Sequence, residues 1–211
     1  MIAALFVETN GVYYGLPDVD PWDKARDARL YAGPHPVVAH PPCERWGEQW
    51  HACRPVGHPK RGRLGDDDGC FASALRKVRH LGGVIEHPAR SRAWAAFGLP
   101  TPNPAGGWMR EPFPEIHNAG IGYSCHVEQG HYGHAVRKAT WLYFVGHERP
   151  PELHWGPSNR PVMDRRPSRR RAGDVAAALC DRGGERHLTP IQFRDVLLDI
   201  ARSATRAQEA A

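Results

Sequence analysis

The chain has 211 residues, of which 41% are hydrophobic and 24% are charged, and these values exclude wholesale disorder, a collagen-like chain and a coiled coil while favouring one compact core. Its 22 glycines and 20 prolines are unusually many, which argues against a helical bundle and predicts many turns between short elements. The 28 Lys and Arg residues exceed the 23 Asp and Glu residues by five, and this positive balance makes nucleic acid a fitting partner.

The first part of the chain is predicted to contain two buried strands. Residues 2–7 (IAALFV) form one apolar run, which a loop follows. Trp22–Tyr31 mixes charged residues with Ala and Leu and is predicted as a short helix. Val37–Ala39 is the second strand, and the HPPC segment (40–43) ends it because proline cannot donate a ladder hydrogen bond. This segment follows the carboxyl end of a strand, where α/β folds place their ligands.

A helix and a third strand are predicted in the middle of the chain. After a polar, basic loop over residues 44–68, apolar residues recur at helical spacing from Phe71 to Leu81, and Asp66–Asp68 supply N-cap candidates. Two glycines end this helix. Val84-Ile85 then begins a strand whose end carries Glu86-His87-Pro88. A second polar tip therefore follows a second strand and turn.

The remaining elements complete an α/β pattern. Ser91–Phe97 is predicted as a short helix, Tyr123–Val127 and Thr140–Val145 as strands, and Thr189-Pro190-Ile191-Gln192 as a capping box that opens a C-terminal helix. We expect a single α/β domain with a reduced, Rossmann-like, mostly parallel sheet. Its parts are a catalytic core at 1–146, a Pro/Arg-rich loop or arm at 147–185, and a C-terminal helix at 186–211 that packs on the core.

Cys43 is the first candidate for chemistry. Its thiol follows two prolines at a rigid turn, and the five cysteines of the chain are odd in number and scattered, which argues against a disulfide framework. Only a thiolate attacks, so a nucleophilic Cys43 needs a lowered pKa, for which His40 and Arg45 are nearby candidates. The alternative is an unreactive, half-buried cysteine beside a structural turn.

Glu86 is the second candidate. It ends the strand that we expect to run parallel to Val37–Ala39, so the two strand tips would meet at one edge of the sheet. A carboxyl group whose pKa is raised by partial burial can donate a hydrogen bond to a ring nitrogen and act as a general acid. The alternative is a structural ion pair with one of the 28 basic residues.

Four segments, two of which contain Cys43 and Glu86, follow one another along the chain in an order that resembles that of a known family. They are VVAHPPC (37–43), VIEHP (84–88), HYGHAVRKATWLYFVG (131–146) and RHLTPIQF (186–193). This order resembles the DNA cytosine carbon-5 methyltransferases, which have Pro-Cys, Glu-Asn-Val, a Tyr-Gly segment with Gln and Arg, and Arg-x-Leu-Thr-Pro-Arg-Glu in succession. The chain has Glu-His-Pro for Glu-Asn-Val, and Val136 where the family has Gln. It is also similar to small phage and prophage proteins with HPPC, GGVxEHP and KxTWLY landmarks.

The resemblance implies covalent catalysis on a pyrimidine ring, with cytosine in DNA as the expected substrate. Cys43 would add to carbon-6, Glu86 would protonate or hydrogen-bond ring nitrogen 3, and Arg137 would contact the ring, so that carbon-5 takes up an electrophile. In duplex DNA the base must first leave the stack. The residues implied in substrate binding are His40, Pro42, Arg45, Trp46, His87, Trp108 and Lys138.

The resemblance also implies S-adenosylmethionine as the one-carbon donor. FVETNG (6–11) stands where the family has a Gly-rich cofactor loop, and it keeps one glycine. The candidate cofactor contacts are Phe6, Glu8, Asp18 and Asp20, whose acids can equally be solvated loop charges. No metal site is predicted, because the pairs His40 and Cys43, His51 and Cys53, and Cys125 and His126 match no familiar zinc spacing.

DNA is the expected partner. Five arginines form a candidate phosphate-contacting arm, namely Arg165, Arg166, Arg169, Arg170 and Arg171. Two alternatives stay open: a non-catalytic phage DNA-binding relative, or the same chemistry on a free pyrimidine nucleotide, against which the arginine arm argues. The apolar run at residues 2–7 is too short for a membrane span and lacks the basic flank of a signal peptide. We therefore expect a cytoplasmic protein, encoded by a phage or prophage in a bacterial host, with no membrane partner.

Overall fold

One seven-stranded sheet forms the centre of the protein. The computed structural model describes residues 1–47, 50, 63–112, 117–162 and 188–204. The strands are β1 (Ile2–Leu5), β2 (Val19–Trp22), β3 (Val37–Ala39), β4 (Gly83–Pro88), β5 (Met109–Arg110), β6 (Ile121–Glu128) and β7 (Ala139–Gly146). Their order across the sheet is β2-β1-β3-β4-β7-β6-β5.

The direction of the strands changes halfway across the sheet. The neighbours β2, β1, β3 and β4 are parallel, whereas β7 is antiparallel to both β4 and β6, and β5 is antiparallel to β6. Only β7 and β5 therefore run against the other strands. β6 and β7 are joined by residues 129–138, which include the 3-10 turn η2 (Gln129–Tyr132). This connection is too short for the crossover that parallel strands need, so the two strands must be antiparallel. The predicted α/β fold with a Rossmann-like, mostly parallel sheet is confirmed.

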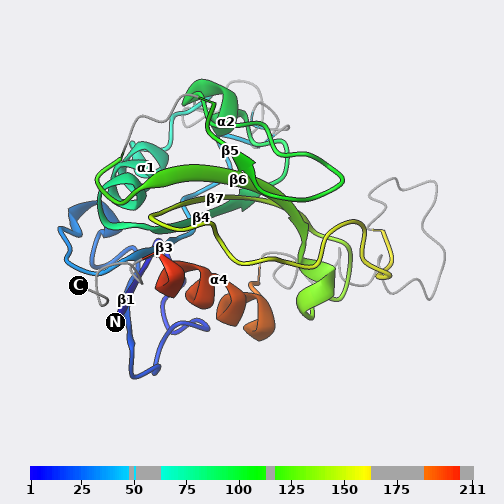
Figure 1. Cartoon of the computed structure of the whole chain (residues 1–211). Coiled ribbons are helices and arrows are strands. Elements are labelled where there is room, and N and C mark those ends of the chain that lie inside the picture. Colours follow the sequence, from blue (N-terminus) through cyan, green and yellow to red (C-terminus); the bar gives the residue numbers. More distant parts are fainter. Residues whose placement is uncertain (48–49, 51–62, 113–116, 163–187, 205–211) are drawn as a thin grey trace.

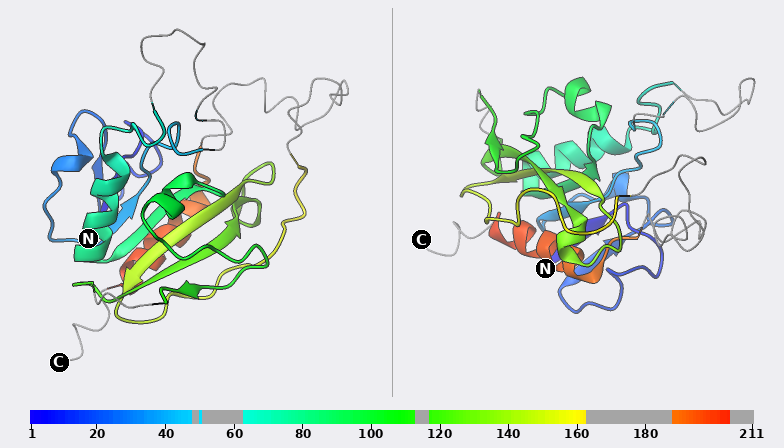
Figure 2. Two further views of the ribbon diagram at one scale, coloured as in Figure 1. Left: turned by 90° about the horizontal axis from the view of Figure 1, so that it is seen from above. Right: turned by 90° about the vertical axis from the view of Figure 1, so that its right-hand side faces the viewer.

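Helices cover both faces of the sheet, as Figure 1 shows. The helices α1 (Cys70–Leu81) and α2 (Arg92–Ala96) lie on one face, and α4 (Ile191–Ser203) lies on the other. Seen from above, α4 lies beneath the long strands of the sheet (Figure 2, left). Every helix in the described part of the chain is too short or too polar to span a bilayer.

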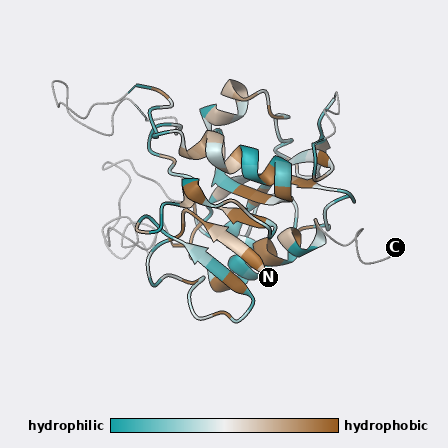
Figure 3. Cartoon of the chain, turned by 90° about the vertical axis from the view of Figure 1, so that its left-hand side faces the viewer, coloured by the Kyte–Doolittle hydropathy of each residue, from teal (hydrophilic) through white to brown (hydrophobic). Residues whose placement is uncertain are grey.

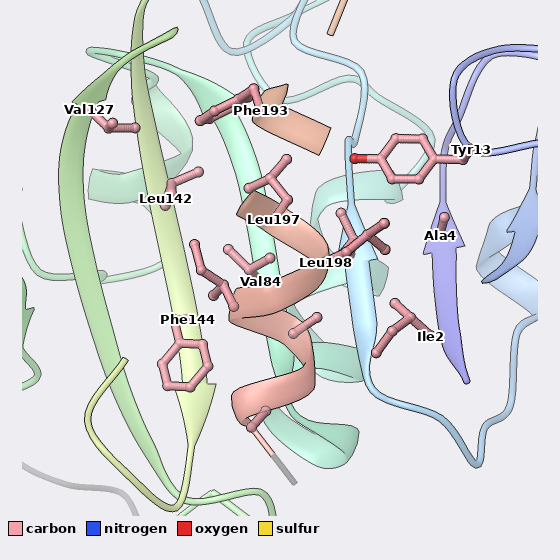
Figure 4. Packing of buried hydrophobic residues seen from close by; sticks show 14 of the residues in the cluster. Ile2, Ala4, Tyr13, Val84, Val127, Leu142, Phe144, Phe193, Leu197 and Leu198 are labelled. Atoms are coloured by element: carbon pink, nitrogen blue, oxygen red, sulfur yellow. The ribbon is translucent and has the colours of Figure 1, made fainter. Parts of the chain in front are cut away.

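The core is divided in two by the sheet, because successive side chains of a strand point to opposite faces. Val84 of β4 packs with Phe193 and Leu197 of α4, a contact visible in Figure 4. Its neighbour Ile85 packs on the other side, with Phe71 of α1. Because these strands are buried on both faces, their sequences are continuous apolar runs. Figure 3 accordingly shows hydrophobic residues on the central strands.

The connection from α1 to β4 depends on glycine. Gly82 ends α1 with a φ of 81°, and Gly83 follows with a φ of 119°. A Cβ atom on Gly83 would lie 2.0 Å from the carbonyl oxygen of Val37, so β4 could not pair closely with β3 there. This pair of glycines sets the register in which Ala39 faces Ile85.

Two of the elements expected from the sequence are wrong. Residues 22–31 are not a helix: Val19–Trp22 forms the edge strand β2, and only the 3-10 turn η1 (Ala28–Leu30) follows. An edge strand tolerates Pro21, which has no N–H to donate. The side chain of Asp23 accepts hydrogen bonds from the backbone N–H groups of Ala25 and Arg26 and so favours a turn.

The expected capping box at the start of α4 is also wrong. Pro190 is itself the N-cap of α4, and no side chain caps the helix. Gln192, whose side chain would complete the box, packs against Gly133 instead. The N-cap candidates Asp66–Asp68 of α1 are wrong as well, because Gly69 is the N-cap and has no capping side chain. Asp67 still accepts a hydrogen bond from the N–H of Phe71 in the first turn (2.8 Å).

Candidate functional site

A cavity of about 830 Å³ opens at the carboxyl ends of β1, β3 and β4. Its walls are the loop 6–13 that follows β1, the turn 40–43 that follows β3, and residues 86–88 at the end of β4. Lys138, Leu188 and Thr189 complete the lining. A cavity of this volume lies in the range of small-molecule sites.

Cys43 and Glu86 both line this cavity. The parallel register that places Ala39 beside Ile85 also places the residues after them, His40 and Glu86, side by side. The two prolines then carry the chain on to Cys43 at the same edge of the sheet. The structure thus brings together the two candidates that the sequence placed at neighbouring strand tips.

The carboxylate of Glu86 is buried and has a hydrogen-bond donor at each oxygen. His40 Nδ1 lies 3.0 Å from Oε2, and Gln129 Nε2 donates to Oε1 at 3.0 Å and to the hydroxyl of Thr140 at 2.9 Å. Burial alone would raise the pKa of Glu86, but the hydrogen bond with His40 and the positive charge of Lys138 prevail and lower it from 4.5 to about 2. The expected rise in the pKa of this group is therefore wrong, and Glu86 is ionised.

Cys43 is a half-buried, free thiol. Burial and the negative charge of Glu86 raise its pKa, whereas Lys138 acts in the opposite direction. A nucleophilic cysteine needs a lowered pKa, but this site raises the pKa of Cys43. Cys43 is protonated at neutral pH until something in the cavity accepts its proton.

Tyr13, Gln129 and Thr140 belong to the site, and the sequence did not single them out. The hydroxyl of Tyr13 lies 2.8 Å from His40 Nε2, on the far side of the imidazole from Glu86. Gln129 and Thr140 come from the antiparallel half of the sheet. No short motif marks these residues, because their contacts depend on which strands become neighbours.

His87 occupies the opposite face of β4 from Glu86. It lines the cavity, is 1% exposed, and packs against Phe71 and Trp94. Neither ring nitrogen has a hydrogen-bond partner of ordinary geometry among the described residues, although the carbonyl of Pro42 lies near enough to act on its charge. Burial lowers the pKa of His87 from 6.5 to about 4, so the ring is neutral.

Several predicted site residues lie elsewhere. Arg137 does not line the cavity, although the next residue, Lys138, does, and it forms an ion pair with Glu128 (2.9 Å) instead. Trp46 is buried beneath Phe71 and donates to Asp67, and Trp108 packs against Phe144 on the other face of the sheet. Neither tryptophan can hold a base in the cavity, and Arg45 is not part of its lining. Of the expected substrate contacts, the cavity is lined by His40, Pro42, His87 and Lys138.

The expected cofactor contacts are divided. Phe6 and Glu8 line the cavity, but Asp18 pairs with Arg202 (2.5 Å) and Asp20 with Arg26 (2.6 Å), both outside its lining. The loop after β1 is closed on itself, since a Cβ atom on Gly11 would lie 2.9 Å from the carbonyl oxygen of Glu8. The residues present do not form the set expected for S-adenosylmethionine.

The loop after β1 is instead held from two sides. The carboxylate of Asp23 accepts hydrogen bonds from the hydroxyls of Thr9 (2.6 Å) and Tyr14 (2.9 Å). Arg194 of α4 donates to the carbonyl oxygen of Val12 at 2.7 Å. These contacts fix the cavity wall that carries Tyr13.

Two sets of predicted residues lie outside the described part of the chain. They are the arginine arm (Arg165, Arg166, Arg169, Arg170 and Arg171) and the pair His51 and Cys53. Within the described part, no three His, Cys, Asp or Glu residues are grouped to hold a metal ion. Comparisons with known protein families and with curated proteins find no match to this chain.

Proposed function

We propose that the protein modifies carbon-5 of a pyrimidine, with cytosine in DNA as the substrate, by covalent attack of Cys43. One observation carries the proposal: a thiol and an ionised carboxylate line a single cavity at the carboxyl ends of parallel strands. The cavity is far larger than a pyrimidine ring, so a base that has left the DNA stack can enter together with part of its backbone.

Because Glu86 is ionised, it can first accept a proton as a base and only then donate that proton as an acid. In the first step the Cys43 S–H bond breaks, its proton passes to the Glu86 carboxylate, and the sulfur bonds to carbon-6 of the ring. The electrons of the carbon-5–carbon-6 double bond move toward nitrogen 3, which takes the proton from Glu86. The proton lost by the thiol is thus the one that the ring gains, and Glu86 returns to its starting state.

The free energy of the proton transfer can be bounded. An ordinary thiol and a carboxylate of pKa about 2 differ by about 6.5 pKa units, which is about 9 kcal/mol against transfer, and the raised pKa of Cys43 makes this value a lower limit. A turnover of about 10 per second corresponds to a barrier of about 16 kcal/mol, so the transfer fits beneath it. A bound ring that accepts a hydrogen bond from the acid form of Glu86 lowers the gap further.

Carbon-5 of the adduct is then nucleophilic. It bonds to a one-carbon electrophile, whose bond to its leaving group breaks. Water in the cavity then takes the proton from carbon-5, the double bond re-forms, and the sulfur leaves carbon-6 as a thiolate. Nitrogen 3 returns its proton to this thiolate through Glu86, so that Cys43 and Glu86 regain their starting states. The expected contacts for S-adenosylmethionine are incomplete, so the electrophile is not assigned to that donor. The covalent activation of the ring does not depend on which electrophile follows.

The decisive test measures the covalent activation of the ring without any one-carbon donor. In D₂O a deuteron can take the place of the electrophile, so the protein should exchange hydrogen for deuterium at carbon-5 of cytosine without any donor. Mass spectrometry of nucleosides from a treated oligonucleotide measures the exchange, and dCMP as a second substrate tests the free-nucleotide alternative. Exchange that persists at the wild-type rate in Cys43→Ser would falsify the covalent mechanism.

A non-catalytic DNA-binding protein is the second candidate, and the raised pKa of Cys43 favours it. Such a protein needs no thiolate. It would bind DNA with an affinity that falls steeply with salt, and it would show no exchange at carbon-5. Nucleoside mass spectrometry of DNA from cells that express the protein separates the two candidates, because a new pyrimidine species arises only with the enzyme.

A further inference from the structure

A row of three hydrogen-bonded side chains crosses the cavity. The hydroxyl of Tyr13 lies 2.8 Å from His40 Nε2, and His40 Nδ1 lies 3.0 Å from Glu86 Oε2. Each group comes from a different part of the sheet edge: the loop after β1, the turn after β3 and the end of β4. Tyr13 is 3% exposed, and its phenol is held over the imidazole with ring centroids 5.4 Å apart.

The direction of each hydrogen bond in this row follows from the end groups. Glu86 is ionised and can only accept, so His40 Nδ1 must carry a proton. Burial, and then the negative charge of Glu86, raise the pKa of Tyr13, so its hydroxyl keeps its proton. Because this hydroxyl is buried and His40 Nε2 is its hydrogen-bond partner among the described residues, the proton is donated to Nε2. Both neighbours are therefore satisfied by one form of the imidazole, the neutral tautomer with its proton on Nδ1.

We propose that Tyr13 is a positioning residue that acts through His40 to keep Glu86 an available base. This rests on the proposed function of Glu86. If Nε2 lost the tyrosine hydroxyl, its lone pair would be free, and the imidazole could take up a second proton there while Nδ1 still donates to the carboxylate. Glu86 would then be paired with an imidazolium cation, which stabilises its ionised form and makes it a weaker base for the proton of Cys43.

The position of Tyr13 is built into the fold. Arg194 of α4 holds the preceding carbonyl group, that of Val12, and Asp23 holds the hydroxyl of the following Tyr14. Figure 4 shows the hydroxyl oxygen of Tyr13 directed toward the chain that continues from β3. The phenol therefore contacts His40 because both flanking residues are tethered.

The chain offers a matched control in a tyrosine outside the cavity. Tyr31 donates its hydroxyl to the carbonyl oxygen of His35 at 3.2 Å, and it is not part of the cavity lining. Tyr31→Phe and Tyr13→Phe each remove one hydroxyl from a buried tyrosine. Only the second removes the partner of His40 Nε2.

The tautomer of His40 can be read directly by nitrogen-15 NMR of the histidine rings in the full chain at pH 7.5, with His40→Asn to assign the signals. We expect a proton on Nδ1 alone in the wild type and in Tyr31→Phe, and protons on both nitrogens in Tyr13→Phe. A Tyr13→Phe ring that carries a proton on Nδ1 alone overturns the proposal. So does a wild-type ring that is protonated on Nε2 alone or on both nitrogens.

A second measurement asks whether the tautomer matters for chemistry. Tyr13→Phe should slow deuterium exchange at carbon-5 about fivefold, with the loss in kcat and not in KM, whereas Tyr31→Phe should leave the rate unchanged. His40→Asn places an amide N–H where Nδ1 was and should retain more activity than His40→Gln, which does not.

The two measurements combine in a double-mutant cycle. In the His40→Asn background, Tyr13→Phe should have no further effect on exchange, because the link between the hydroxyl and Glu86 is already gone. Equal, additive losses would show that Tyr13 acts by another route. If the wild type shows no exchange at all, the proposed function fails, while the tautomer measurement still decides the role of Tyr13.

Discussion

His40 Nδ1 lies 3.0 Å from Glu86 Oε2, across the boundary between two neighbouring parallel strands. This contact is the main reason why a buried carboxyl group in the cavity is ionised instead of protonated. It makes the reactivity of the site depend on proton positions as much as on the presence of Cys43.

Glu86→Gln should abolish the base that accepts the thiol proton. We expect deuterium exchange at carbon-5 to fall by about 10² to 10⁴, the usual contribution of a general acid or base. The same change leaves His40 and Gln129 both donating to an amide that has a single acceptor, so thermal stability should fall as well. Glu152→Gln, at an exposed residue remote from the cavity, serves as the control. Exchange that survives in Glu86→Gln would remove this residue from the mechanism.

Lys138 should govern the reactivity of the Cys43 thiol. Its positive charge lowers the pKa of Cys43, against burial and the charge of Glu86, so Lys138→Gln should raise that pKa. Alkylation of Cys43 by iodoacetamide at pH 8 should then be about two- to fivefold slower, measured on the peptide that contains Cys43. Lys77→Gln, on the helix that covers the other face of the sheet, should leave the rate unchanged.

His87 should make the fold sensitive to acid. Its pKa is about 4 in the folded protein and about 6.5 when unfolded, so as pH falls below 6.5 the unfolded state gains a proton that the folded state does not. By pH 4.5 this lowers the free energy of unfolding by about 2 to 3 kcal/mol. His87→Phe removes that loss, and urea unfolding at pH 7 and pH 4.5 measures it. An equal loss in both proteins would assign the acid sensitivity to other groups.

Asp23 should stabilise the cavity wall through its negative charge. Hydrogen bonds from Thr9, the backbone of Arg26 and Tyr14 lower the pKa of Asp23 from 3.8 to about 2, so its contribution is present above pH 3.8 and is lost as pH falls through 2. Asp23→Asn should lower Tm at neutral pH and speed proteolysis within residues 6–14. Asp199→Asn, at an exposed position of α4, provides the comparison, and identical cleavage patterns would contradict the prediction.

The sequence allowed much of the parallel half of the sheet to be predicted. Apolar runs at β1, β3 and β4 end in prolines or glycines, so the strands and their tips are local features that one segment reveals by itself. This is why Cys43 and Glu86 could be placed at the same edge. The edge strand β2 was not predicted, because its Asp20 and Pro21 are typical of a loop.

The partners of Glu86 could not be predicted in the same way. Gln129 reaches Glu86, and Tyr13 reaches its partner His40, only because a loop and an antiparallel pair of strands lie beside the same strand end, and no spacing in the sequence encodes that arrangement. The pKa values were misjudged for a related reason. Burial alone gives the wrong sign for Glu86, and the hydrogen bonds that reverse it are visible only in three dimensions.

The tether between Arg194 and the carbonyl group of Val12 joins positions 182 residues apart. Closing so long a loop is slow compared with local helix and strand formation, so the cavity wall should settle late as the protein folds. Docking of α4 therefore completes the wall that carries Tyr13, and the hydrogen bonds of His40 and Glu86 reach their final arrangement only after that step.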